Sequence, residues 1–334
     1  MSPRLKAIIQ YAIIFAITFL LITYSLRGLQ GENKWDYLKE TWQAADKGWL
    51  FAMAGIAMLS HLIRAERWRM LMTPAGHHPK LSNSFYSLMV GYLVNLVIPR
   101  GGEVSRCYNL YKLDKTPVDM SFGTVVVERI IDMICLLILI AISFAVESEK
   151  LFQFIDTLTF ETSGNKSTLN INLLLYIGIA GILGLTALFY YLRKNEKVRS
   201  FLSKTWAGFK QGLLSVFQLK NKWLFIFYSI TIWALYFLTS YAVLKAFPTT
   251  SELGFGAVLS LFAIGSIAMA APLPGGTGSY HVLVPQGLVF LYGVPHTEAT
   301  AFTFIFHGWQ TAIMIVGGAI SLIVTSFLVR KKNK

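Results

Sequence analysis

The sequence has few charged residues, only two cysteines and no long hydrophilic stretch. Asp, Glu, Lys and Arg make up 14% of its 334 residues, against roughly 25% in an ordinary soluble domain. Cys107 and Cys135 lack the spacing of metal ligands, so we interpret both as apolar packing residues. Because no hydrophilic segment is long enough for a separate soluble domain, we expect no appended catalytic domain.

Motifs of the common hydrolytic and nucleotide-dependent enzymes are also missing. The chain has no H-E-x-x-H zinc motif, no Walker lysine loop and no G-x-S-x-G elbow. We therefore expect a protein that is not an enzyme, with no catalytic residue, no metal and no cofactor. The net charge of +13 would indicate nucleic acid in a soluble protein, but here we expect no nucleic-acid partner, because the basic residues flank apolar segments.

Apolar residues make up 54% of the chain, and the mean hydropathy is +0.54. They gather in runs of the ~20 residues that a bilayer-spanning helix needs. The sequence thus predicts an all-α, polytopic membrane protein whose first apolar helix is not cleaved. The predicted full spans are 7–26, 48–64, 120–146, 171–192, 223–246 and 298–328, and two further apolar regions, 81–113 and 253–295, each carry a helix-breaking motif.

The distribution of positive charge predicts the topology. We interpret each broken region as a hairpin that enters and leaves on one side, although a pair of short full spans would give the same parity. With both termini in the cytoplasm, the cytoplasmic segments carry 22 Lys and Arg residues and the external ones carry 7. This asymmetry follows the positive-inside bias and predicts a multi-pass protein of the cytoplasmic membrane.

Two amphipathic segments lie between the predicted spans, at about 33–47 and 200–220. Basic amphipathic stretches of this kind usually lie at the membrane surface. For 200–220, docking of a partner or gating is the alternative.

The two halves of the chain have matching landmarks. One span in each half opens with the same three residues, Trp49-Leu50-Phe51 and Trp223-Leu224-Phe225, which are 174 positions apart. Each hairpin is interrupted by a proline, Pro99 or Pro274, and these two are 175 positions apart. Inverted repeats with broken helices are a transporter architecture. We therefore predict a single transmembrane domain over 1–334, built from repeats at about 1–150 and 165–330, with chance similarity as the alternative.

The first broken motif is charged. It reads Pro99-Arg100-Gly101-Gly102-Glu103, follows Asn95 and continues to Arg106. The spacing of Arg100, Glu103 and Arg106 predicts three charges along one helix face. A helix N-terminus and two guanidinium groups suit a phosphate, so we predict an anion-binding site here, with an ordinary charged surface loop as the alternative.

The following span contains Glu128, Arg129 and Asp132 in an otherwise apolar stretch. Ionisable groups in a span are costly and usually pair or face a cavity. Glu128 and Asp132 share a face at i, i+4, and Arg129 can pair with Asp132 at i, i+3. We predict a role in the site, and a structural ion pair that joins this helix to the first hairpin is the alternative.

The second broken motif, Pro274-Gly275-Gly276-Thr277-Gly278, carries no arginine. Glycines permit close backbone approach and unusual dihedrals. We predict that this motif lines the opposite side of a path, together with polar side chains nearby, although a buried histidine is commonly a packing residue. The predicted lining residues are Gly275, Gly276, Gly278, Tyr280, His281 and His307.

Three stretches together resemble the transmembrane region of lysylphosphatidylglycerol synthases, which also occurs alone in flippase-like proteins. They are Asn95 with Pro99-Arg100-x-Gly102-Glu103-x-x-Arg106, then Glu128-Arg129-x-x-Asp132, then Pro274-Gly275-Gly276-x-Gly278. The resemblance covers almost the whole chain and implies movement of lipids between leaflets. One departure is His281, where the family often has a glutamate. Without the synthase domain, aminoacylation of lipid is not expected.

We therefore predict a flippase or transporter for a phospholipid or another anionic lipid, whose phosphate binds near Arg100, Arg106 and Arg129. The alternatives are an intramembrane enzyme acting on a lipid phosphate or a polyprenyl-linked sugar, in which the nearby carboxylates serve as acid and base, and an accessory subunit of a separate synthase or glycosyltransferase. The predicted partners are membrane lipids, with such an enzyme or a second copy of the chain as further possible partners.

Overall fold

The structure, a computed structural model, describes residues 3–29, 34–162, 196–271 and 273–332, and within these ranges it contains helices and loops but no strand. Three of the described helical segments are long and apolar enough to cross a membrane, Lys47–Ala75, Lys222–Ala246 and His296–Lys332. The prediction of an all-helical fold with membrane-spanning helices is confirmed to this extent. The predicted span 171–192 lies outside the described residues.

The described helices follow the predicted segments. The predicted spans correspond to α1 (Pro3–Leu26), α3 (Lys47–Met72), α6 (Val118–Thr162), α9 (Lys222–Ala246) and α12 (His296–Lys332), and the amphipathic segments correspond to α2 (Lys34–Ala44) and α8 (Glu196–Leu214). Helix α6 has one non-helical residue, Glu147, and is therefore two helices joined at a kink. Short 3-10 turns, Thr73–Ala75 and Ser215–Gln218, follow α3 and α8.

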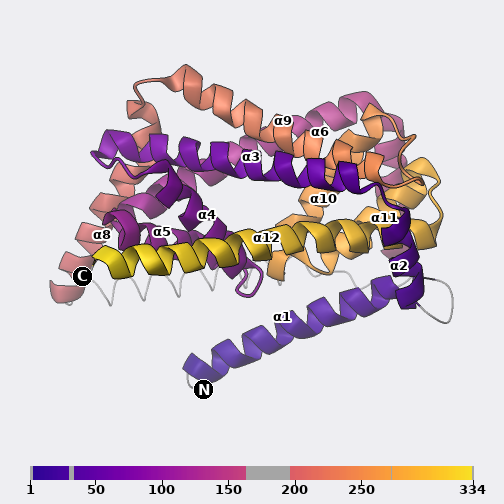
Figure 1. Cartoon of the computed structure of the whole chain (residues 1–334), viewed down its shortest axis with the longest axis horizontal. Coiled ribbons are helices and arrows are strands. Elements are labelled where there is room, and N and C mark those ends of the chain that lie inside the picture. Colours follow the sequence, from indigo (N-terminus) through magenta and orange to yellow (C-terminus); the bar gives the residue numbers. More distant parts are fainter. Residues whose placement is uncertain (1–2, 30–33, 163–195, 272, 333–334) are drawn as a thin grey trace.

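Each broken region folds into two packed helices. The first consists of α4 (Leu81–Asn95) and α5 (Gly102–Asp114), and the second of α10 (Phe255–Ala270) and α11 (Ser279–Tyr292), with a 3-10 turn at Pro274–Gly276. Figure 1 shows the α4–α5 pair in the half of the molecule where α3 and α12 end, and the α10–α11 pair in the other half. Two antiparallel hairpins therefore approach each other from opposite ends.

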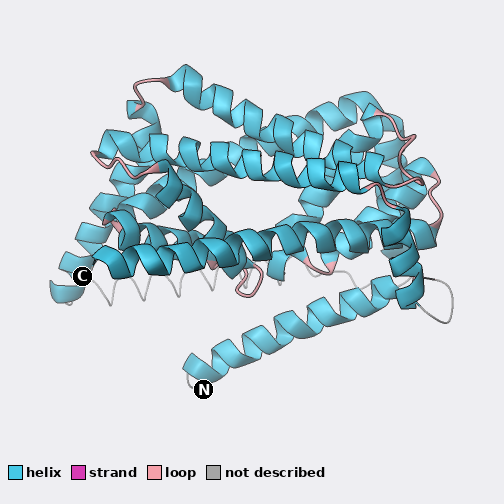
Figure 2. Ribbon diagram, viewed as in Figure 1, coloured by secondary structure: helices cyan, strands magenta, loops and turns pink. Residues whose placement is uncertain are grey.

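The tips of the two hairpins meet. Figure 2 shows their connecting loops near the middle of the long axis, whereas the other loops lie at the ends. A Cβ atom placed on Gly275 would lie 3.0 Å from a Leu96 methyl group, so the turn after α4 contacts the turn before α11. The two motifs that are 175 residues apart in the sequence are thus neighbours in space.

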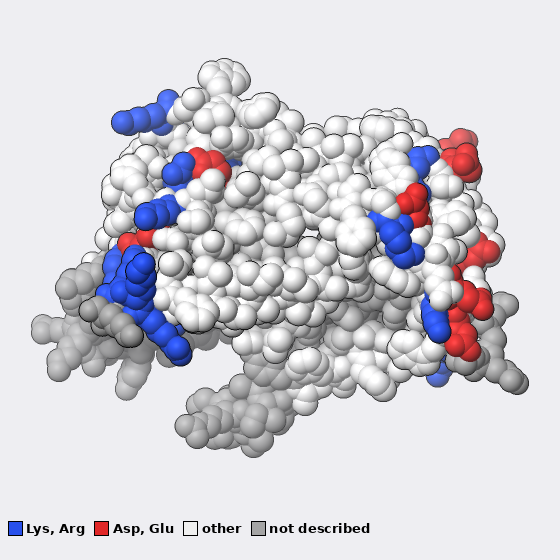
Figure 3. All heavy atoms as spheres, viewed as in Figure 1, with Lys and Arg blue, Asp and Glu red and all other residues white. Residues whose placement is uncertain are grey.

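Charged side chains lie at the two ends of the molecule. On the face in Figure 3, Lys, Arg, Asp and Glu gather at the ends and leave an uncharged belt between them. We call the end that carries Arg69, Lys112, Arg330, Lys331 and Lys332 the basic end. The long helices α9 and α12 carry exposed apolar side chains such as Phe227 and Phe327, and together with the uncharged belt this is the pattern expected of a helix bundle surrounded by lipid.

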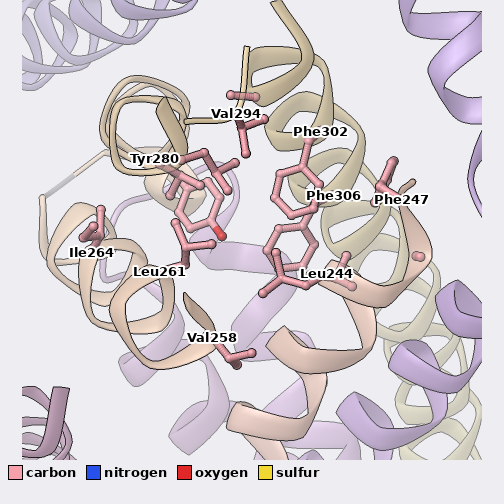
Figure 4. Packing of buried hydrophobic residues seen from close by; sticks show 14 of the residues in the cluster. Leu244, Phe247, Val258, Leu261, Ile264, Tyr280, Val294, Phe302 and Phe306 are labelled. Atoms are coloured by element: carbon pink, nitrogen blue, oxygen red, sulfur yellow. The ribbon is translucent and has the colours of Figure 1, made fainter. Parts of the chain in front are cut away.

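The main apolar core lies in the half away from the basic end. It joins the end of α9 to α10, α11 and the first half of α12 (Figure 4). Phe247 and Phe302 are almost fully buried and lie edge to face, with ring centroids 5.0 Å apart. Such aromatic packing fixes α9 against α12 and thereby positions the second hairpin.

Candidate functional site

Two arginines on α3 form the base of the site. Helix α3 continues beyond the predicted end of its span at residue 64 and buries Arg64 and Arg67. Arg64 Nη2 lies 2.5 Å from Asp132 Oδ2, and Arg67 Nη2 lies 2.6 Å from Asp132 Oδ1. Both carboxylate oxygens of Asp132 are therefore paired, one with each arginine. Neither arginine was among the site residues predicted from the sequence.

Glu128, one turn before Asp132 on α6, pairs with the first hairpin. Arg106 Nη2 on α5 lies 2.6 Å from Glu128 Oε2, and the Glu128 side chain is completely buried. Its other oxygen, Oε1, lies 3.4 Å from nitrogens of both Arg64 and Arg67. The predicted shared face of Glu128 and Asp132 is confirmed. Five charged side chains from α3, α5 and α6 thus form one buried network, which we call the arginine cluster.

The arginine cluster has a net charge of +1, since it holds three guanidinium groups and two carboxylates. Two hydroxyl groups on α9 complete it: Arg64 Nη1 donates to Tyr236 Oη at 2.9 Å, and Arg67 Nη1 donates to Ser229 Oγ at 3.2 Å. A buried charge is tolerated when it is paired and hydrogen-bonded. The cluster therefore ties four helices together and keeps a surplus of positive charge inside the protein.

The Trp68 ring packs against Arg106 of the arginine cluster. The Arg106 guanidinium carbon lies 4.6 Å from the centre of the Trp68 ring, and the indole N–H donates to Thr124 Oγ1 at 2.9 Å. A guanidinium stacked on an indole gains a cation–π contact. This contact holds Arg106 in one orientation, between the indole and Glu128.

The predicted pairing of Arg129 with Asp132 is wrong. Arg129 Nη2 instead lies 2.8 Å from Glu103 Oε1 on α5. The i, i+3 contact is replaced because Asp132 is already held by the two arginines of α3, while Glu103 faces Arg129 across the α5–α6 contact. This pair is partly open, with 46% of the Arg129 side chain exposed.

The predicted alignment of Arg100 with Glu103 and Arg106 on one helix face is also wrong. Helix α5 begins at Gly102, so Arg100 lies in the turn before it, where its φ is +60°. This left-handed backbone conformation directs the chain around the hairpin tip. Arg100 is exposed at the tip and has no ion-pair partner among the described residues.

A shallow recess with room for about one water molecule opens beside the arginine cluster. The close approach of α4 and α5 forms one wall, since a Cβ on Gly102 would lie 2.1 Å from the Gly91 carbonyl oxygen. Asn95 Oδ1 accepts a hydrogen bond from the Gly102 N–H at 2.7 Å and so caps α5. The residues that line the recess are Leu88, Gly91, Tyr92, Asn95, Gly102, Glu103, Arg106 and Arg129.

The residues predicted at the second hairpin form another buried group. The His307 Nε2–H donates to the Gly275 carbonyl oxygen at 3.1 Å, and the Gly278 N–H donates to His281 Nδ1 at 3.3 Å. Tyr280 stacks on His307 with ring centroids 5.1 Å apart. Gly276 has a φ of +71° and, with Gly275 and Gly278 at +58° and +105°, requires the freedom of glycine.

The group at the second hairpin and the arginine cluster lie on opposite sides of the contact between the hairpin tips. Its histidines hold the turn that touches Leu96, whereas Asn95, Glu103 and Arg106 lie on the first hairpin. The predicted site residues therefore form two groups, one charged and one uncharged, separated by the contact between the tips. The described residues contain no cluster of three or more His, Cys, Asp or Glu side chains able to hold a metal ion.

The fold and the site together define a class of protein: a helical membrane protein with two facing hairpins and a buried cationic cluster. The family profile described as the lysylphosphatidylglycerol synthase TM region matches residues 8–318. The chain belongs to this family, and the resemblance noted in the sequence is confirmed.

Two curated relatives are similar to the chain. UPF0104 membrane protein MJ1595 of Methanocaldococcus jannaschii is 34% identical over 80 residues, which cover 23% of this chain and 24% of the relative. Glycosyltransferase AglD of Haloferax volcanii is 24% identical over 306 residues, which cover 84% of this chain and 49% of the relative. In both comparisons the match spans less than half of the relative's own length. No solved structure matches the chain.

Proposed function

We propose that this protein moves a phospholipid or another anionic lipid between the leaflets of the cytoplasmic membrane. The observation that carries the proposal is the recess at the first hairpin, which combines the partly open Arg129 with the buried, net positive arginine cluster. A membrane lipid is the anion most available to a site that opens within a bundle of apolar helices. Membership of a family named after a lipid synthase supports a lipid substrate.

A phosphate can bind at the recess by replacing the carboxylate that pairs with Arg129. Within the described part of the chain, Arg129 is bound by a single carboxylate oxygen, Glu103 Oε1, while Glu103 Oε2 is buried and has no hydrogen-bond partner there. A phosphate can take the place of this carboxylate and accept a bidentate pair from the guanidinium. Arg106, which is already paired with Glu128, supplies positive charge to the recess wall rather than a free ligand.

The contact between the hairpin tips provides the barrier that such a transporter needs. A lipid phosphate that enters at the first hairpin has to pass Leu96 and the Gly275 turn before it reaches Tyr280, His281 and His307. Glycines at this turn allow the backbone to change conformation at low cost. We propose that separation of the tips, with the tails left in the surrounding lipid, opens the path.

The basic end faces the cytoplasm in this proposal. The surplus of Lys and Arg at that end agrees with the positive-inside bias. The first hairpin then enters from the cytoplasm and the second from outside, with both termini of the chain in the cytoplasm.

A second candidate function follows from the relative named as a glycosyltransferase. The match to it covers about half of that protein, so this chain corresponds to part of a larger protein with that name. In this alternative the chain is the membrane part, or a separate subunit, of an enzyme that acts on a lipid-linked sugar. Turnover of a labelled lipid by the purified protein distinguishes this alternative from transport.

Transfer of fluorescent anionic phospholipid in proteoliposomes, followed by quenching of the outer leaflet, tests transport. Arg129→Ala is expected to slow transfer at least about tenfold, because a charge-assisted hydrogen bond contributes about 1.5–3 kcal/mol. Arg69→Ala is the matched control, since Arg69 pairs with Glu66 at the basic end and lies outside the recess.

Three outcomes separate the parts of this proposal. A lower rate for Arg129→Ala with an unchanged rate for Arg69→Ala supports the site. Equal rates for the wild type and Arg129→Ala contradict the site assignment. Absence of transfer by the wild-type protein contradicts the transport function itself.

A further inference from the structure

Two buried histidines hold the turn of the second hairpin. His307 on α12 donates from Nε2 to the Gly275 carbonyl oxygen at 3.1 Å, and His281 on α11 accepts at Nδ1 from the Gly278 N–H at 3.3 Å. The same turn touches Leu96 of the first hairpin. These two hydrogen bonds therefore fix one side of the contact between the hairpin tips.

The two hydrogen bonds also define which ring nitrogens carry a proton. A backbone N–H only donates, so His281 Nδ1 is unprotonated and the neutral ring carries its proton on Nε2. A carbonyl oxygen only accepts, so His307 Nε2 is protonated. A further proton on His307 would go to Nδ1 and leave the bond to Gly275 intact. A further proton on His281 would go to the accepting Nδ1 itself and would turn one hydrogen bond into two opposed donors.

The described parts of α12 and α1 that contact His281 bring no negative charge to it. From α12, the rings of Phe304 and His307 lie with centroids 4.4 and 4.8 Å from that of His281. From α1, the Ser25 hydroxyl donates to the His281 carbonyl oxygen at 2.6 Å. His307 is the titratable neighbour, and a charge on it would oppose a positive charge on His281 rather than stabilise it.

The other described elements that pack on α11 supply no counter-ion either. Helix α10 contains no charged residue. Helix α6 carries Glu147, which pairs with Lys150 beside Tyr292, about three turns of α11 away from His281. The charged residue at the tip of the first hairpin is Arg100, which is positive. A protonated His281 in the closed turn would thus be a buried cation without a partner, which is unfavourable.

We propose that His281 is a proton-binding site and that a proton on its Nδ1 releases the contact between the hairpin tips. The proton comes from water and takes the lone pair that accepts from the Gly278 N–H, so this hydrogen bond breaks as the new N–H bond forms. The imidazolium then leaves its apolar surroundings for water, and the turn moves away from Leu96. The proposal rests on the proposed function, since it names the event that separates the tips and opens the path.

The size of the effect follows from the linkage between proton binding and opening. A histidine in water has a pKa of about 6.5, whereas the closed turn has no acceptor left for the additional proton. Each pH unit below the pKa of the exposed imidazole then favours the open turn about tenfold. The ratio of open to closed turn is expected to rise about thirtyfold from about pH 8 to about pH 5.

Thiol labelling measures this opening without any transport. Thr277→Cys places a single cysteine directly after the 3-10 turn, in a variant whose Cys107 and Cys135 are replaced by serine. Its rate of reaction with a methanethiosulfonate reagent in nanodiscs is divided by that of Lys39→Cys, an exposed position on α2. The intrinsic reactivity of the thiol cancels at each pH, and the ratio of rates is expected to rise about thirtyfold from about pH 8 to about pH 5.

Variants of the histidines make the test specific. In His281→Asn, Oδ1 takes the place of Nδ1 and accepts from the Gly278 N–H at every pH, so the ratio of rates is expected to stay level. His307→Gln keeps an N–H donor for Gly275 and leaves His281 in place, so the rise is expected to persist. His78→Asn is the matched control, because His78 is exposed in the loop before α4, and it is expected to keep the rise.

The outcomes separate the proton site from the transport function. A level ratio in the wild type, or the same rise in His281→Asn, overturns the proposal. A rise that His281→Asn removes supports it, even if leaflet-resolved transfer shows no transport by the wild type and the proposed function fails. If His281→Asn does not fold, His281→Gln decides in the same way, because glutamine at this third helical position is a favoured acceptor for the N–H of the capping residue.

Discussion

At the scale of the residue, the most demanding position is Glu128. Its side chain is completely buried and lies within 3.4 Å of guanidinium nitrogens from three arginines, of which Arg106 is the nearest at 2.6 Å. Burial of a carboxylate is unfavourable unless such partners compensate. Glu128 therefore holds together three positive side chains that would otherwise repel one another inside the protein.

Replacement of Glu128 is expected to destabilise the protein strongly. Glu128→Gln leaves Arg106 without its carboxylate, and loss of one member of a buried ion pair costs about 3–5 kcal/mol. Denaturant unfolding in detergent, followed by tryptophan fluorescence, measures the change. Glu66→Gln is the control, because the Glu66–Arg69 pair is partly exposed and such pairs contribute about 1 kcal/mol or less. Similar small losses for both variants would contradict the structural role of Glu128.

Only part of the site could be predicted at the residue scale. The acidic residues in the span, Glu128 and Asp132, were evident because a charge inside an apolar run is rare. Arg64 and Arg67 were not evident, because they lie at and just after the predicted end of a span and resemble an ordinary basic flank. Their partner Asp132 is more than 60 residues away, so no local spacing indicates the pairing.

At the scale of the element, the first hairpin depends on contact between two backbones. Gly91 and Gly102 let α4 and α5 approach so closely that a side chain on Gly102 would overlap the Gly91 carbonyl oxygen and the Asn95 side chain. The same approach places Asn95 in reach of the Gly102 N–H. The recess is therefore shaped by glycines as much as by its charged residues.

Gly102→Ala is expected to separate α4 from α5 and to weaken anion binding at the recess. The added Cβ would lie 2.1 Å from a backbone oxygen, which cannot move as the end of a flexible side chain can. Unfolding and lipid binding both measure the effect. Gly55→Ala on α3 is the control, since nothing lies within 4 Å of its Cβ and alanine favours a helix interior by up to about 1 kcal/mol. If Gly102→Ala behaved like Gly55→Ala, the close contact would not matter.

The elements themselves were largely predictable, because apolar runs and proline–glycine breaks mark helices and their ends directly. The predicted end of the second span at residue 64 was too early, since α3 continues to Met72. The run Arg64-Ala65-Glu66-Arg67-Trp68-Arg69 is polar in the sequence. Pairing with α6 nevertheless buries part of it, which a hydropathy pattern cannot show.

At the scale of the whole molecule, the arrangement of charge predicts how the protein lies in its membrane. The basic end and the opposite end are separated by an uncharged belt (Figure 3). In a variant in which Cys107 and Cys135 are replaced by serine, single cysteines at Lys331 and at Lys39, two exposed positions on α12 and α2, are expected to react with a membrane-impermeant thiol reagent from opposite sides. Lys39→Cys is labelled in intact cells and Lys331→Cys only after permeabilisation. Labelling of both in intact cells would contradict the topology.

The inverted repeat remains a prediction at this scale. Two hairpins that enter from opposite ends and meet at Leu96 and Gly275 are what an inverted repeat would produce. The first span of the second repeat, 171–192, falls outside the described residues. The chemical difference between the hairpins is clear, since the first holds charged residues and the second histidine, tyrosine and glycine backbone.

The end-to-end contact of the hairpins also has an electrical consequence. In the proposed topology, with each hairpin reaching about half-way into the membrane, a recess beside the hairpin tips would place a bound phosphate part of the way across the membrane voltage before any conformational change occurs. The full drop is worth about 2.3 kcal/mol per elementary charge per 100 mV. A lipid phosphate that passes the tips would therefore move through only the remaining fraction of this field, so its crossing rate would respond to voltage as if it carried less than one charge.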